Sequence, residues 1–120
     1  MINRIPSPNS DDTYSSCACA GGFIFLSHHA GGFDQQNIKH QMRAAFDSVK
    51  QTLAKVGASM NDMVQIHLYL KSLSDFDAAR EVFYEYFDSG CFPPRMTSTS
   101  DFLDDNCLCM IDGIAYKVQS

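Results

Sequence analysis

The amino-acid sequence predicts an α+β sandwich in which two helices pack on one face of a mixed sheet, in the order β-β-α-β-α-β-β. Three observations lead to this prediction. Segments 38–56 and 76–87 repeat apolar residues every three or four positions, as amphipathic helices do. Segment 63–70 alternates in the manner of a strand. Segments 23–26 and 107–118 are apolar on both faces, which is typical of strands that are buried on both sides.

The first residues predict a lead-in followed by a hairpin. Residues 1–13 have no apolar core segment and are rich in Ser, Pro, Asn and Asp. We therefore expect a flexible lead-in before one domain that spans residues 14–120. Strand-like runs at 14–20 and 23–27 are separated by Gly21-Gly22, and two glycines suit the positive φ angles of a tight type I′ turn.

Local signals bound the two helices. Asn37 stands where a side chain can cap the start of the first helix, and Gly57 stands where a left-handed C-terminal cap belongs. The second helix is expected to open at Ser74, with Asp77 as a capping-box-like acid, and to end before Gly90.

The last two strands are expected at 96–102 and 107–118. Helices can cover only one face of a small sheet, so the apolar residues on the other face need a further layer. We expect another copy of the chain to supply that layer.

Charge and composition exclude several classes of function. The chain has nine Lys and Arg residues against fourteen Asp and Glu residues, a formal net charge of −5, and its basic residues are scattered. Nucleic-acid binding needs a basic stripe, so we expect no nucleic-acid partner. No run is long enough to cross a bilayer and no signal peptide is visible, which predicts a cytoplasmic protein without a membrane partner.

The five cysteines suit reduced thiols better than a disulfide framework, because their number is odd and the expected compartment is reducing. Two C-x-C pairs, Cys17/Cys19 and Cys107/Cys109, could hold a structural zinc ion if their strands lay close together. The usual C-x-x-C spacing is absent, however, and free cysteine is a normal core residue. We expect no metal, with zinc as the weaker alternative.

Arg95 is the strongest single candidate for a ligand-binding residue. It follows Pro93 and Pro94, whose fixed φ angles give a stiff, extended approach. A guanidinium held in this way matches both oxygens of a carboxylate. The alternative is an ordinary surface ion pair with a nearby Asp, which is common and weak.

Six local motifs follow one another along residues 14–118: Tyr14-Ser15, Gly22–Ser27, Val56–Ser59 before Asp62, Leu68–Leu70 leading into Asp75-Phe76, Phe92–Arg95, and Ile111–Ala115. Together they resemble the reactive-intermediate deaminase family, also called the YjgF or RidA family. The resemblance implies a chorismate-mutase-like fold, a homotrimer with clefts between its subunits, and no metal or other cofactor.

Enzymes of that family hydrolyse enamines and imines of amino acids to 2-keto acids and ammonia, so the resemblance implies a 2-iminobutanoate/2-iminopropanoate deaminase-like activity. It implies that Arg95 grips the substrate carboxylate. Asp112 stands where the family commonly has glutamate and would orient or activate water. The expected third catalytic residue is Tyr14, and the expected substrate contacts are Arg95, Ser27, Phe83 and His29.

These assignments have structural alternatives. Asp112 is equally well explained as a partner for Arg95 or for a backbone donor. Tyr14 can be an edge-strand aromatic residue, and Ser27 a strand-end hydroxyl. His28 and His29 either act as bases or anion-binding groups near the cleft or are solvated loop residues. As neighbours, they are expected to point in different directions.

The chain departs from the family pattern at His28, His29, Arg80, Thr97 and Asp112. The aspartate shortens the reach of the carboxylate by one methylene, and displacements of about 1 Å can cost roughly a hundredfold in rate. A second class of function therefore stays open. In it, a non-catalytic homotrimer binds a small carboxylate metabolite through Arg95 and regulates a partner.

Overall fold

The computed structural model describes residues 1–118. Its strands are β1 (Asn3–Pro6), β2 (Ser15–Ala20), β3 (Phe23–His29), β4 (Met63–Leu70), β5 (Arg95–Thr99) and β6 (Cys109–Tyr116), and its α-helices are α1 (Ile38–Lys55) and α2 (Phe76–Tyr86). Two short 3₁₀ helices, η1 (Met60–Asp62) and η2 (Leu73–Asp75), precede β4 and α2.

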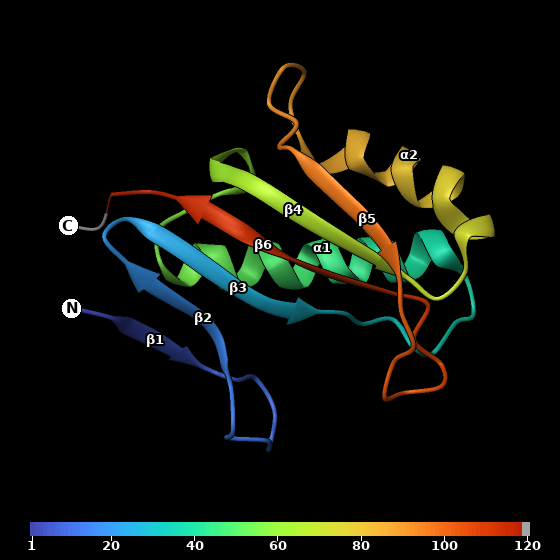
Figure 1. Cartoon of the computed structure of the whole chain (residues 1–120), viewed down its shortest axis with the longest axis horizontal. Helices are drawn as coiled ribbons and strands as arrows, with labels where there is room; N and C mark the ends of the chain where they lie inside the picture. Colours follow the sequence, from blue (N-terminus) through green and yellow to red (C-terminus); the bar gives the residue numbers. More distant parts are fainter. Residues whose placement is uncertain (119–120) are drawn as a thin grey trace.

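The six strands form one mixed sheet in the order β1-β2-β3-β6-β4-β5, and both α-helices pack on one of its faces. The β4–β5 pair is parallel and the other four pairs are antiparallel. In Figure 1, α1 runs behind the central strands. The core lies in this layer and includes fully buried Phe46 of α1, Ile66 of β4 and Ile111 of β6. The predicted α+β architecture is confirmed.

The turn and cap signals of the sequence act as expected. Gly21 and Gly22 have φ angles of 58° and 91° in the β2–β3 turn. The Asn37 side chain accepts a hydrogen bond of 3.0 Å from the backbone N–H of His40, which caps α1. Gly57 follows the helix with a φ angle of 77°, the left-handed conformation that a residue with a Cβ rarely adopts.

The N-terminus differs from the expected flexible lead-in. Residues 3–6 form β1, which pairs antiparallel with β2 at the edge of the sheet. Four residues are too few to display an alternating pattern, and Ile5 is the one apolar residue in the strand that is partly buried. Pro6 lies at the end of this edge strand, where a missing N–H costs little.

The start of α2 also differs. Its N-cap residue is Asp75, which makes no side-chain capping bond, so the predicted cap by Ser74 is wrong. The preceding 3₁₀ turn takes that place, and there the Ser72 hydroxyl accepts a hydrogen bond from the Ser74 backbone N–H. The last two strands are shorter than expected. β5 ends at Thr99 and not at residue 102, and β6 covers 109–116 and not 107–118.

The face of the sheet opposite the helices is apolar and open in a single chain. Phe23 and Phe25 of β3 are 44% and 47% exposed there, and Tyr116 packs edge-on against Phe23. Val64 and Met96 are exposed as well. Residues 1–118 of a single chain therefore do not supply the second covering layer that the sequence predicts for β3. Among residues 1–118, no helix is long and apolar enough to cross a membrane.

Gly113 allows β6 to lie close to β4. A Cβ atom at this position would lie 2.3 Å from the carbonyl oxygen of Gln65 and 2.7 Å from the Cε atom of Met63. Because that carbonyl is part of the β4 backbone, a side chain would push the two strands apart. We expect Gly113→Ala to lower the free energy of unfolding by about 1–3 kcal/mol, measured by urea denaturation. A variant as stable as the original chain would contradict this close approach.

Candidate functional site

The side chains that the sequence assigns to the site form two groups on opposite sides of the sheet. Arg95 and Phe83 lie on the side that carries the helices, at the β5 edge. Asp112 lies on the open face, opposite His67 of β4. Tyr14 and Ser27 line a hollow at the end of the sheet where β3 finishes. One chain therefore holds two partial sites, one at Arg95 and Phe83 and the other at Asp112, Tyr14 and Ser27.

Arg95 is fixed by the backbone before it and by aromatic rings beneath it. The carbonyl of Pro94 accepts a hydrogen bond of 2.9 Å from the Ile66 N–H, which joins the proline segment to β4. The guanidinium carbon lies 5.2 Å from the centre of the Phe76 ring and 5.1 Å from that of Phe83. Such cation–π contacts contribute about 0.5–2 kcal/mol and leave the N–H groups available.

A hollow of about 160 Å³ lies beside Arg95. It is lined by Arg80, Phe83, Tyr84, Phe92, Pro93 and Arg95, and no lining residue is acidic. Within residues 1–118, the Arg95 guanidinium has no ion pair or hydrogen bond, although the chain carries excess negative charge. The alternative interpretation of Arg95, an ion pair with a nearby aspartate, has no support among these residues. A free guanidinium above apolar rings is well suited to a carboxylate ligand.

Asp112 is held by two polar side chains on the open face. The Tyr69 hydroxyl donates a hydrogen bond of 2.8 Å to its Oδ2 atom, and the Nε2 atom of His28 lies 3.1 Å from the same oxygen. Among residues 1–118 it pairs with neither Arg95 nor a backbone donor, so neither structural alternative for Asp112 applies within one chain.

A β-bulge explains why His28 reaches Asp112. The register between β3 and β6 shifts between Leu26 and His29, so Ser27 and His28 together stand opposite the single residue Asp112. A bulge of this kind re-aims side chains and often occurs beside active sites. His28 is 54% exposed and Asp112 is 23% exposed, so the pair remains open to a ligand.

Tyr69 and His67 lie beside Asp112 and His28 in the same polar cluster, and neither was expected in the site. The Tyr69 ring stacks on His67 with centroids 3.9 Å apart, and the His67 Nε2 atom lies 2.8 Å from the Ser98 hydroxyl. Desolvation, with the Asp112 carboxylate as a second cause, raises the pKa of Tyr69 to about 12. Tyr69 therefore stays a protonated donor to Asp112 at neutral pH. The signal for both residues was the mixed face of 63–70.

Tyr14 and Ser27 line a hollow of about 230 Å³ together with His28. The Tyr14 hydroxyl accepts a hydrogen bond of 2.8 Å from the Asn9 side chain. The Ser27 hydroxyl donates one of 3.1 Å to the Ser16 carbonyl. Both residues thus border the same hollow as His28, and their assignment to the site remains a proposal.

His29 turns away from His28 and is largely buried, although it also borders the hollow that Tyr14, Ser27 and His28 line. It is 6% exposed, and both ring nitrogens have internal partners: Nδ1 donates to the Ser27 carbonyl at 2.6 Å, and Nε2 accepts from the Thr52 hydroxyl at 2.8 Å. Burial lowers its pKa, which favours the neutral ring. Both ring nitrogens thus have partners within residues 1–118, and contact of His29 with a substrate remains a proposal.

The two C-x-C pairs do not form a metal site. Among residues 1–118, no three His, Cys, Asp or Glu side chains are grouped in a way that could hold a metal ion. Burial raises the pKa of Cys17 to about 11 and that of Cys109 to about 12, as expected of thiols packed in a core. A role as buried core residues therefore explains the four cysteines better than a zinc site does.

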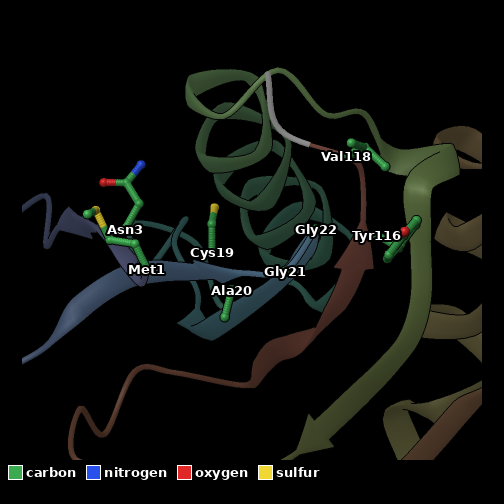
Figure 2. Close-up of a pocket in the computed structure, with 8 residues that line it drawn as sticks. All are labelled: Met1, Asn3, Cys19, Ala20, Gly21, Gly22, Tyr116 and Val118. Atoms are coloured by element: carbon green, nitrogen blue, oxygen red, sulfur yellow. The ribbon is translucent and has the colours of Figure 1, made fainter.

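A larger hollow lies elsewhere and contains none of the predicted site residues. It measures about 460 Å³ and is lined by Met1, Asn3, Cys19, Ala20, Gly21, Gly22, Tyr116 and Val118. Figure 2 shows these residues beside the β2–β3 turn and the end of β6. No lining side chain is a carboxylate, a histidine, a lysine or an arginine, so the hollow offers no cationic side chain to a carboxylate ligand.

Comparison with known proteins gives consistent matches over nearly the whole chain. A family model described as Endoribonuclease L-PSP matches residues 4–117. A RutC family protein of Pyrococcus abyssi is 32% identical over 117 residues, covering 92% of this chain and 91% of its own. A 2-iminobutanoate/2-iminopropanoate deaminase of Dermatophagoides farinae is 28% identical over 120 residues, covering 95% and 93%. The crystal structure of a YjgF family member from Neisseria meningitidis superposes with a TM-score of 0.89 at 20% identity, covering 100% and 98%.

Proposed function

The chain belongs to the Endoribonuclease L-PSP family, also called YjgF or RidA, and we propose that it hydrolyses small enamine or imine acids to 2-keto acids and ammonia. The observation that carries this proposal is the unpaired Arg95 guanidinium, which faces an apolar hollow without a carboxylate partner among residues 1–118. The activity named for the relative from Dermatophagoides farinae supports it. The net charge of −5 argues against the RNA cleavage that the family description names.

We propose that neighbouring copies of the chain bring the two partial sites together in a homotrimer. Arg95 on β5 and Asp112 on β6 are separated by β4 and lie on opposite faces. Neighbouring strands are about 4.8 Å apart, so the backbones of β5 and β6 are separated by roughly 10 Å. The thickness of the sheet adds to the distance between the two side chains. The exposed apolar face that includes Phe23 and Phe25 supports such an assembly, because a second copy would bury it.

In the assembled cleft, Arg95 would hold the substrate carboxylate while Asp112 and His28 manage water. The Nε2 atom of His28 faces Asp112, and no residue within 1–118 hydrogen-bonds to its Nδ1 atom. Nδ1 can therefore accept a proton from a water molecule as the water oxygen bonds to the iminium carbon. The π electron pair of the C=N bond moves onto nitrogen, which gives a carbinolamine.

The second half of the reaction returns that proton. His28 protonates the amino group of the carbinolamine, and the C–N bond then breaks with its electron pair leaving on nitrogen. The hydroxyl oxygen forms the C=O bond and releases its proton through the His28–Asp112 pair to the departing ammonia. The products are a 2-keto acid and ammonium, and no cofactor is required. Tyr69 would keep Asp112 in position throughout.

The alternative is a non-catalytic homotrimer that binds a small carboxylate metabolite through Arg95. It uses the same guanidinium but needs no proton transfer at Asp112. The expected cytoplasmic location applies to both functions and is likewise a proposal.

The direct test generates imines in situ with an amino-acid oxidase and measures the release of 2-keto acid with and without the protein. Semicarbazide reacts faster with the free imine than with the 2-keto acid and gives the same semicarbazone with both, so accelerated hydrolysis lowers the initial rate of semicarbazone formation. We expect the chain to compete with the trap. Tight binding of 2-keto acids without faster hydrolysis would favour the alternative, and neither binding nor hydrolysis would contradict both.

A further inference from the structure

The hollow beside Arg95 contains a second guanidinium. The chain has four arginines, and two of them, Arg80 and Arg95, line this one hollow. Arg43 is engaged elsewhere in two hydrogen bonds with Glu85, and Arg4 lies on the edge strand β1. Half of the arginines of an acidic protein thus converge on a small cavity without an acidic lining residue.

Arg80 is only weakly neutralised by its own neighbours. Its closest acidic group is Asp77, one turn earlier on α2, with a separation of 3.9 Å and 91% exposure of the aspartate side chain. Glu81, which also feels the charge of Arg80, is held by Lys39 in a hydrogen bond of 2.6 Å. An exposed pair at 3.9 Å stabilises little, so Arg80 remains available to an anionic ligand.

Apart from Pro93, the rest of the lining is aromatic, and the hollow is small. Phe83 lies beneath Arg95, and Tyr84 packs edge-on against Phe92 with centroids 5.6 Å apart. A volume of about 160 Å³ accepts a metabolite of a few carbons but not a nucleotide. The lining therefore offers two cations separated by an apolar surface, which matches two carboxylates joined by a short carbon chain.

We propose that this site selects dicarboxylic acids, so that the substrates are four- or five-carbon 2-imino dicarboxylates. Arg95 binds the carboxylate next to the imine carbon and Arg80 binds the distal carboxylate. This inference rests on the proposed function for its catalytic part, while the selection of a dicarboxylate is a property of the hollow itself. Arg80 is then the specificity-determining residue, and a substrate with an apolar side chain would leave its charge without a partner.

The test compares 2-oxo acids as ligands by isothermal titration calorimetry at fixed pH and ionic strength. A four-carbon 2-oxo dicarboxylate is compared with 2-oxobutanoate, which has the same number of carbons and one carboxylate. Inorganic phosphate serves as a third probe. Arg80→Asn removes the second cation, and Arg4→Asn removes the same charge on the far edge strand. A charge-assisted hydrogen bond changes affinity by about 10- to 100-fold.

We expect the original chain and Arg4→Asn to bind the dicarboxylate about 10- to 100-fold more tightly than 2-oxobutanoate, and Arg80→Asn to lose that preference. Equal affinities in the original chain, or a preference that survives in Arg80→Asn, would overturn the inference. Phosphate binding as tight as that of the dicarboxylate would also overturn it, since the hollow would then be a general anion site.

Imine hydrolysis separates this inference from the proposed function. The imines are made from aspartate and from alanine by their oxidases. For each imine, the activity of Arg80→Asn is divided by that of the original chain, so that differences between the two oxidases cancel. We expect this ratio to be about 10- to 100-fold lower for the imine of aspartate than for that of alanine. If Arg80→Asn changes the hydrolysis of both imines by the same factor, the inference of dicarboxylate selection fails and the proposed deaminase function stands. If the dicarboxylate preference appears in binding but no imine is hydrolysed, the inference stands and the catalytic function fails.

Discussion

Arg95→Ala is expected to lower kcat/KM for imine hydrolysis by a factor of about 30 to several thousand, equivalent to about 2–5 kcal/mol of lost stabilisation. The guanidinium has no partner among residues 1–118, so its N–H groups are available to the substrate carboxylate. The alanine variant loses that interaction. The same change should weaken the binding of 2-keto acids in the absence of turnover. Steady-state kinetics with oxidase-generated imines and calorimetry with 2-keto acids measure the two effects.

Arg95→Lys is the matched control, since it keeps one positive charge and removes the planar fork. We expect it to recover only part of the lost affinity, because an ammonium group cannot pair with both carboxylate oxygens in parallel. Circular dichroism should show both variants folded, as the side chain is exposed and its loss leaves no buried cavity. An alanine variant with unchanged kinetics would show that the carboxylate binds elsewhere.

Asp112→Asn is expected to lower kcat by about 10²- to 10⁴-fold while the KM changes much less, which is the usual range for the loss of a general acid–base group. The amide still accepts the hydrogen bond from Tyr69 but cannot take up a proton or balance the charge of a protonated His28. The variant therefore separates proton transfer from substrate binding. Rapid quench of a single turnover would measure the chemical step itself.

His28→Gln should share this loss, and the chain offers a control for it. His40 forms a second histidine–aspartate pair with Asp34, also 3.1 Å apart, on the solvent side of α1. His40→Gln should therefore leave kcat unchanged. Loss of activity in Asp112→Asn together with full activity in His28→Gln would restrict proton transfer to the carboxylate and contradict the role given to His28.

The fold could be predicted where the signals are local. The strand at 63–70 has the bounds that its alternation gives, and α1 ends where Gly57 allows. The edge strand β1 was missed because its four residues depend on pairing with β2 rather than on a pattern of their own. The cap of α2 was misplaced because a 3₁₀ turn precedes the helix, and Ser72 and Ser74 are equally plausible caps from composition alone.

The surroundings of the candidate residues were predictable in the same measure. The extended approach to Arg95 follows from the two prolines before it, which are local constraints, and its aromatic support follows from the apolar stripe of α2. The contact of Asp112 with His28 depends on a register shift between β3 and β6, which no segment of the sequence encodes by itself. The contact of His29 with Thr52 could not be foreseen, because Thr52 lies 23 residues away on α1.

We propose that Arg95 of one copy and Asp112 of another complete each cleft, and mixing two inactive variants tests this arrangement. Arg95→Ala and Asp112→Asn are co-expressed in equal amounts, purified together and assayed for imine hydrolysis. In randomly mixed trimers, three quarters contain both variants and each of these regains one intact site of three, so about a quarter of the original activity should return. If activity stays at the level of the separate variants although the mixed assembly has formed, both residues act within one chain and the account is wrong.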